Sequence, residues 1–292
     1  MTLVKDAFRV HNRHRANGDL GVEIEVEGDN LPEPQDYWRC EYDGSLRGES
    51  KEYVLRKPYT LASTRLALEH LDKCYIDNNT VVHESVRAGV HVHVNVQELT
   101  TVELFTFMVA YIILEDLLIK YCGEYREGNL FCLRLKDAEH LLYVIEQVAE
   151  TRDYTQFQSE MLRYSSMNVC SLWKFGSLEF RAMRGTRDLE LVGDWAEILL
   201  NIRNQAIKYA NAKELVEDIH TNGSESFLEV FLGTFKEQLC NGLPVEEYVT
   251  DGLLRASELA LSTDWESFKM KNIGGLDFPI DVEYPDVPME DF

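Results

Sequence analysis

Three short segments of the chain alternate between apolar and polar residues, a pattern that predicts β-strands with one apolar face and one polar face. They are residues 21–27, 90–96 and 177–181. Carboxylates crowded on neighbouring strands repel one another unless protons, arginines or metal ions neutralise them. The pattern therefore indicates a site that handles divalent metal ions. The polar positions are Glu23, Glu25, Glu27, His91, His93, Asn95, Glu179 and Arg181.

The remaining periodicity predicts how strands and helices follow one another. Strand signals dominate residues 20–58, and a helix is expected over 60–76. Thr100 and Glu103 form a capping-box pattern, which predicts a long helix over 101–121. Since no regular βαβ alternation appears, we expect an α+β fold with a mainly antiparallel sheet and helices on its outer face. Further helices are expected after Asp137 and near 188–210, 212–220, 224–240 and 245–261, with breaks at Asn222-Gly223 and Gly242-Leu243-Pro244.

These elements favour a division of the chain into four parts. An N-terminal segment, 1–19, precedes a core over 20–210 that contains the three alternating strands. Residues 211–273 are expected to form a helical C-terminal extension packed on the core. Residues 274–292 contain prolines and several acids, and we expect an extended tail there.

The acidic composition argues against one class of partner. The chain has 29 Lys and Arg residues against 51 Asp and Glu residues, which gives a formal net charge of −22. Because such a chain repels phosphate backbones, we expect no binding of nucleic-acid backbones. Arg181, Arg184 and Arg187 form a local basic cluster in the sequence. This cluster either holds a small phosphate ligand or is neutralised by ion pairs.

Other features of the sequence bear on location. The six cysteines are scattered without a C-x-x-C pair, and the polar N-terminus lacks the apolar stretch of a signal peptide. The most apolar segment, 102–114, is too short for a membrane span and is followed by Glu115 and Asp116. We therefore expect no membrane association and a reduced, cytoplasmic location.

Glu23 and Glu25 are two residues apart on one strand, so both carboxylates can reach one or two hard cations from the same face. The alternative is a strand whose acids simply face water. His91 and His93 have the same spacing and can be metal ligands, nucleotide contacts or solvent-facing residues. Histidine beside carboxylates favours Mg²⁺ or Mn²⁺ over a structural zinc site, because the usual cysteine ligands are absent.

Glu179 and Arg181 add a further acid and a guanidinium that can bind phosphate oxygens through two hydrogen bonds. Their alternative role is a cross-strand salt bridge. The chain contains no phosphate-binding G-x-x-x-x-G-K-[ST] loop, no G-x-G-x-x-G fingerprint and no G-x-S-x-G elbow. Any phosphate group must therefore be held by residues of the sheet.

In order and spacing, six motifs of this chain resemble the amidoligases of phages and bacteria. These are carboxylate-amine ligases related to glutamine synthetase and glutamate-cysteine ligase. The resemblance spans residues 20–200, and it departs from the family at 52–58, where EYVLRKP replaces the usual E-[LI]-V-S-P-P. The motifs are Gly21-Val22-Glu23-Ile24-Glu25-Val26-Glu27, Asp43-Gly44-Ser45-Leu46, Glu52-Tyr53-Val54, Gly89-Val90-His91-Val92-His93-Val94, Arg163-Tyr164-Ser165-Ser166-Met167-Asn168, and Leu178-Glu179-Phe180-Arg181 with Gly185-Thr186.

The resemblance implies a curved, glutamine synthetase-like sheet at 20–210 that binds ATP and Mg²⁺ or Mn²⁺. It implies that His93 faces the nucleotide, that Arg181 steadies the transferred γ-phosphate, and that Asp43 lies close to the metal or the incoming substrate. It places Arg163 and Asn168 near the substrates, ATP among them. The metal ligands that it implies are Glu23, Glu25, Glu52, His91 and Glu179.

The expected activity is ATP-dependent formation of an amide or peptide bond between a carboxylate and an amine, each a small molecule or a peptide. Transfer of the γ-phosphoryl group to the carboxylate would give an acyl phosphate, which the amine attacks. Asp43 or another acid would take the amine's proton. Two alternatives stay open: a metal-dependent hydrolase or phosphotransferase, and an inactive phage-encoded binding or structural protein in the host cytoplasm. Assembly into a homo-oligomer is also left open.

Overall fold

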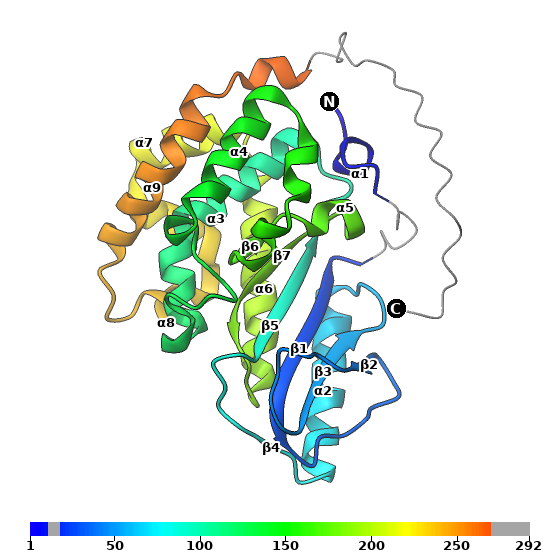
Figure 1. The fold of residues 1–292 in the computed structure, drawn as a ribbon. Helices are drawn as coiled ribbons and strands as arrows, with labels where there is room; N and C mark the ends of the chain where they lie inside the picture. Colours follow the sequence, from blue (N-terminus) through cyan, green and yellow to red (C-terminus); the bar gives the residue numbers. More distant parts are fainter. Residues whose placement is uncertain (11–17, 270–292) are drawn as a thin grey trace, which may run out of the picture.

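The computed structural model describes residues 1–10 and 18–269, so the tail expected at 274–292 lies outside the described residues. Figure 1 shows an α+β fold in which one sheet lies against a larger body of helices. The strands are β1 (Leu20–Asp29), β2 (Trp38–Glu41), β3 (Ser50–Leu55), β4 (Val81–Val82), β5 (Gly89–Asn95), β6 (Met167–Asn168) and β7 (Ser177–Arg184).

Most of the helices lie after β5. The α-helices are α1 (Val4–Ala7), α2 (Leu61–Asp77), α3 (Thr101–Cys122), α4 (Glu139–Thr151), α5 (Ser171–Phe175), α6 (Leu189–Ala206), α7 (Ala212–Leu232), α8 (Lys236–Cys240) and α9 (Val245–Ser262). Short 3₁₀ turns are η2 (Glu124–Arg126), η3 (Leu135–Asp137), η4 (Tyr154–Gln158), η5 (Glu160–Tyr164), η6 (Gly233–Phe235) and η7 (Trp265–Lys269).

Six strands form an open sheet in the order β2-β3-β1-β5-β7-β6, and β4 pairs with the end of β1. Every strand pairing among the described residues is antiparallel, as the sequence predicts. The three alternating segments are confirmed as strands β1, β5 and β7, and they are consecutive in the sheet. This order places β5 between β1 and β7, so that segments far apart in the chain become neighbours in the sheet.

The apolar face of the sheet is covered by α2, α3 and α6. Phe180 of β7 packs against Phe107 and Tyr111 of α3, with ring centroids 5.6 and 4.7 Å away. The indole of Trp38 on β2 donates a hydrogen bond to the carbonyl of Ala67 on α2 (2.9 Å). These helices and the aliphatic residues of the strands belong to one continuous hydrophobic core. The other face of the sheet is therefore left for the polar side chains.

Helix α3 lies in the middle of the helical body and is buried on nearly all sides. Its predicted start is confirmed, because Thr100 and Glu103 form a complete capping box. The C-terminal helices α7 and α9 pack on the side of α3 that faces away from the sheet. The backbone of α9 approaches that of α3 closely at Gly252. A Cβ atom at this position would lie 2.3 Å from the carbonyl oxygen of Ile113 on α3.

The C-terminal helix boundaries differ from the predicted ones. The break at Asn222-Gly223 is confirmed only as a kink inside α7, where Gly223 adopts a φ of +85°. The helix predicted over 224–240 is wrong in extent, because Gly233 (φ +53°) ends α7 and a 3₁₀ turn separates it from α8. The hydrophobic periodicity of the sequence continues through this turn, so it could not reveal that the helix is interrupted. Within residues 1–10 and 18–269, no helix is both long and apolar enough to span a membrane.

Candidate functional site

The pairing of β1, β5 and β7 places their polar side chains on one face. Glu23 of β1 is opposite His91 of β5, and His93 is opposite Glu179 of β7. On the other side of β1, Glu25 is opposite Glu52 of β3. Side chains directly opposite each other on antiparallel strands are close enough to interact. The sheet therefore concentrates four carboxylates and two imidazoles on three neighbouring pairs of positions.

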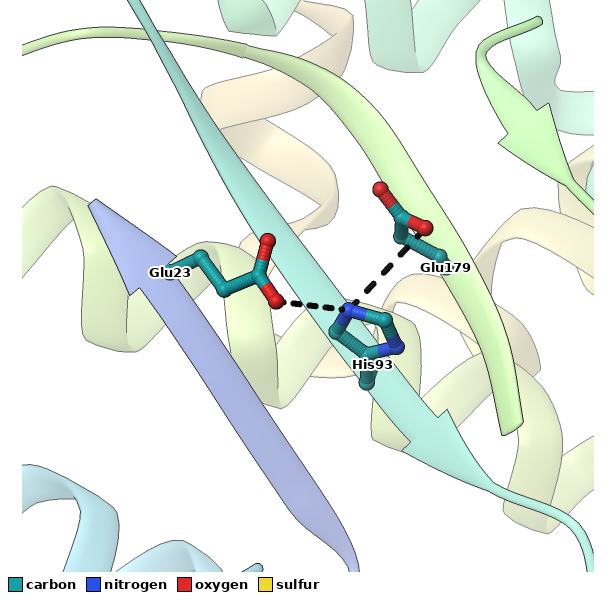
Figure 2. A group of neighbouring side chains, drawn as sticks. All are labelled: Glu23, His93 and Glu179. Atoms are coloured by element: carbon teal, nitrogen blue, oxygen red, sulfur yellow. Dashed lines mark ion pairs between the residues drawn. The ribbon is translucent and has the colours of Figure 1, made fainter. Parts of the chain in front are cut away.

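The first group of potential metal ligands consists of Glu23, His93 and Glu179, shown in Figure 2. Nε2 of His93 lies 3.3 Å from Glu23 and 4.0 Å from Glu179. One ligand atom from each of the three residues falls within 4.8 Å of the others. Nδ1 of His93 lies 3.1 Å from the hydroxyl of Ser177, which fixes the orientation of the ring. The resemblance assigned His93 to the nucleotide, and the geometry places it among the metal-competent side chains.

The second group consists of Glu25, Asp43 and Glu52, whose ligand atoms also lie within 4.8 Å of one another. The backbone N–H of Gly89 donates to the Glu25 carboxylate (2.8 Å). Asp43 comes from the loop between β2 and β3, where its carboxylate accepts a hydrogen bond from the N–H of Ser45 (2.6 Å). This short turn holds Asp43 above the sheet beside the two glutamates.

His91 lies between the two groups. Its Nδ1 is 3.2 Å from Glu23 and 3.7 Å from Glu179, and its Nε2 is 3.6 Å from Glu25. With only 4% of its surface exposed, its ring is enclosed by these acids. The two ligand groups are thus parts of one continuous polar cluster.

Arg181 and Asn168 complete the cluster from the β7 side. The guanidinium of Arg181 contacts the carboxylate of Glu179 at 2.5 Å and lies 3.5 Å from Nδ1 of His91. Nδ2 of Asn168, on the short edge strand β6, donates to the other oxygen of Glu179 (2.6 Å). Arg181 favours the ionised form of Glu179, and both residues fix the direction of its carboxylate.

The charges of the two groups are balanced differently. Burial opposes ionisation of Glu23 and Glu179, but the neighbouring histidines, and Arg181 beside Glu179, hold both pKa values below the usual range. Burial raises the pKa of Glu25, although His91 offsets part of this effect. Burial and the nearby carboxylates of Glu23, Glu25 and Asp43 raise the pKa of Glu52 to about 8. The surroundings of Glu25 and Glu52 therefore favour the protonated carboxyls, whereas those of the first group favour the carboxylates.

Some predicted residues lie away from the cluster. Arg163 is exposed on η5 and has no hydrogen bond or ion pair with the cluster among the described residues. Glu27 accepts a hydrogen bond from the N–H of Arg47 (2.8 Å) and belongs to neither ligand group. The basic cluster of the sequence is divided, because Arg184 donates to carbonyls at the end of α3 and Arg187 pairs with Asp72. Of these three arginines, only Arg181 contacts a carboxylate of the polar cluster, that of Glu179.

Two features of the site carry no signal in the sequence. Arg126 is 1% exposed, and its guanidinium donates to the carbonyls of Ala182 (2.8 Å) and Arg181 (2.7 Å), tying the loop after α3 to β7. A cleft also opens beside Glu23 and His93, with Lys57 and Gln97 in its lining. Neither could be found from alternation, because both depend on long-range packing.

The chain was compared with known proteins. No protein-family model matches it, and no significant match was found among the curated proteins. The fold and the site define a protein with an open antiparallel sheet that gathers two carboxylate-rich ligand groups on one face. The resemblance to amidoligases rests on the motifs alone.

Proposed function

We propose that this protein is an ATP-dependent carboxylate-amine ligase built on a glutamine synthetase-like sheet. One observation carries the proposal: the two potential metal-ligand groups are adjacent on one sheet face, joined by His91 and flanked by Arg181. Phosphoryl transfer asks a protein mainly for positioning and for neutralisation of the phosphate charge. Arg181, together with cations held by the two groups, would supply that neutralisation.

The residues of both groups fit Mg²⁺ or Mn²⁺. Carboxylate oxygens with at most one imidazole per group are the donors that these hard cations accept. Glu52 supports the fit, because burial and neighbouring acids raise its pKa to about 8, and a bound cation would favour its ionised form. Bound ions would supply positive charge to neutralise the phosphates of ATP. Glu23, His93 and Glu179 would hold one ion, and Glu25 and Glu52 the other, with Asp43 close by.

The chain's own residues have separate tasks in this reaction. Arg181, which is always charged, steadies the γ-phosphoryl group as it moves to the substrate carboxylate. Asp43, which its turn holds on a loop rather than on a strand, would take the proton of the amine as the amine attacks the acyl phosphate. Arg39 and Lys57 line the cleft beside Glu23 and offer positive charge to the rest of the nucleotide.

The first test is thermal unfolding with ATP, with and without Mg²⁺, since a ligand that binds only the folded state raises the apparent stability. The proposal expects Mg²⁺-dependent stabilisation by ATP, followed by ADP release that requires both an acid and an amine. Glu23→Gln should abolish both effects while leaving the fold intact. The matched control is Glu217→Gln, an exposed position on α7, which should behave as the wild type.

Two results would redirect the assignment. Phosphate release that does not depend on any amine would favour a hydrolase or phosphotransferase. Normal Mg-ATP binding by Glu23→Gln would remove Glu23 from the metal site.

A further inference from the structure

Strand β7 contains an extra residue where it passes β5. His91 of β5 lies opposite two residues of β7, Arg181 and Ala182, because its two neighbours on β5 pair with residues 180 and 183. Such an arrangement is a β-bulge, which interrupts the ladder of hydrogen bonds between the strands. Bulges are frequent next to active sites, where they change the direction of a side chain. The side chain affected here is the guanidinium that completes the polar cluster.

The side chain of Arg126 reaches the backbone of this bulge. Its Nε donates to the carbonyl of Ala182 (2.8 Å), and its Nη2 donates to the carbonyl of Arg181 (2.7 Å). A planar guanidinium presents its N–H groups as a rigid fork, which suits two neighbouring carbonyls. Arg126 comes from η2, directly after α3, and is 1% exposed. One buried side chain that belongs to no strand therefore fixes both residues of the bulge.

The charge of Arg126 is not paired with an acid. Over residues 1–10 and 18–269, no carboxylate forms an ion pair with its guanidinium, whose remaining contact is the carbonyl of Ala88 at 3.5 Å. A buried charge without a counter-ion is costly. An apolar side chain would fill the same space without this cost. The hydrogen bonds to the bulge therefore account for the presence of a guanidinium at this position.

Gly89 leaves room for this guanidinium beside His91. A Cβ atom at Gly89 would lie 3.1 Å from Nη2 of Arg126 and 3.5 Å from Nε2 of His91. The first of these distances is shorter than an ordinary van der Waals contact. The guanidinium of Arg126 and the ring of His91 thus converge on the space that the glycine leaves empty.

The loop that carries Arg126 also contacts the side chain of Arg181. Nε of Arg181 donates to the carbonyl of Phe131 in this loop (3.4 Å). Nη1 of Arg181 contacts the carboxylate of Glu179 and lies 3.5 Å from Nδ1 of His91. Arg126 holds the backbone of Arg181, and Phe131 holds its side chain. The loop after α3 therefore fixes Arg181 at both ends.

We propose that Arg126 positions Arg181, because its hydrogen bonds to the bulge hold the guanidinium of Arg181 against Glu179 and His91. The consequence for catalysis rests on the proposed function, in which Arg181 steadies the γ-phosphoryl group. Arg126 is then a positioning residue that acts through Arg181 and does not touch the nucleotide. Since a small displacement of a catalytic group lowers the rate steeply, loss of Arg126 should lower kcat more than it weakens ATP binding.

The first measurement needs no nucleotide. In protein with isotope-labelled arginine, the Nε–H signal of Arg181 is identified by its disappearance in Arg181→Lys, and its exchange with water is followed by NMR. Arg126→Lys keeps the charge but loses the fork, and Arg126→Met loses both. In each variant the Nε–H of Arg181 should exchange about tenfold faster than in the wild type, because a side chain held less firmly leaves its contacts more often.

The second measurement is turnover. In Arg126→Met, kcat for ADP release should fall about 100-fold, while KM for ATP changes by less than about twofold. The matched control is Arg65→Met, which removes ion pairs with Asp194 and Glu197 between α2 and α6 on the other face of the sheet. This control should keep both kcat and the exchange rate at Arg181.

Each outcome bears on a stated claim. Unchanged exchange at Arg181 in a folded Arg126 variant would overturn the inference and leave the ligase proposal standing. Faster exchange with unchanged kcat would overturn its catalytic consequence, and so would an equal loss of kcat in Arg65→Met. If both Arg126 variants failed to fold while Arg65→Met folded, Arg126 would serve the fold alone, and the inference would again be overturned.

The ligase proposal fails separately. A wild type that releases no ADP with any acid and amine would overturn the proposed function, whereas the exchange measurement would still decide whether Arg126 positions Arg181.

Discussion

Glu115 should make the stability of this protein depend on pH in an unusual direction. Its carboxylate is wholly buried on α3, where it accepts hydrogen bonds from the N–H of Leu135 and the hydroxyl of Ser166. Burial nevertheless raises its pKa from 4.5 to about 7. The folded protein therefore holds a proton here that the unfolded chain releases between about pH 4.5 and pH 7.

The sign of the effect follows from this proton. Because the native state binds more protons in that interval, the contribution of Glu115 to the free energy of unfolding falls as pH rises, and it levels off above about pH 7. At about 1.4 kcal/mol per pKa unit, the shift corresponds to a loss of about 3 kcal/mol. Glu115→Gln keeps the shape of the neutral carboxyl and cannot ionise. Its stability relative to the wild type should therefore rise by about 3 kcal/mol between pH 4.5 and pH 8.

Urea unfolding of both proteins at several pH values measures this difference directly. Comparing the two proteins cancels the titration of all other groups. The control Glu217→Gln, on the exposed face of α7, shows what the same exchange of Glu for Gln does at a position that is not buried. If the difference for Glu115→Gln also stayed constant from pH 4.5 to pH 8, the carboxyl would titrate normally and the argument from burial would be refuted.

Two further substitutions test how α3 is held. Thr100→Ala removes the side chain that caps α3 and should cost about 1 kcal/mol in urea unfolding, whereas Thr221→Ala on the exposed surface of α7 should change stability little. Gly252→Ala would stabilise an isolated helix by about 1 kcal/mol, yet here the added methyl meets a carbonyl of α3, and we expect destabilisation of about 1–3 kcal/mol. Leu254→Ala, at a 70% exposed position of the same helix, is its control, and a more stable Gly252→Ala would contradict the close packing.

The strands that carry the polar cluster could be predicted from the sequence because each has one polar face and one apolar face. Alternation of period two is unambiguous in such strands, so Glu23, His93 and Glu179 could be placed on one face without a structure. The alternation of polar and apolar residues did not predict the order of the strands in the sheet. That β1, β5 and β7 lie side by side was inferred from chemistry, because acids and imidazoles on three strands can form one metal site only if the strands are neighbours.

Other parts of the site could not be predicted for physical reasons. The pairing of β5 with β7 shifts between Val90 and Val92, and such an irregularity leaves no trace in hydrophobic alternation. The strand that carries Asn168 has only two residues, too few for any periodicity. The partners of Arg126 and Gln97 are backbone carbonyls far away in the chain, and any residue type provides a carbonyl.

Helix α3 has a consequence for any attempt to shorten the protein. The sheet buries one side of α3, and α7 and α9 bury the opposite side. A fragment ending at residue 210 would contain every member of the polar cluster and would still expose a long strip of leucine, isoleucine and valine to water. Such a strip invites association between fragments. The smallest soluble piece that keeps the site should therefore extend through α9.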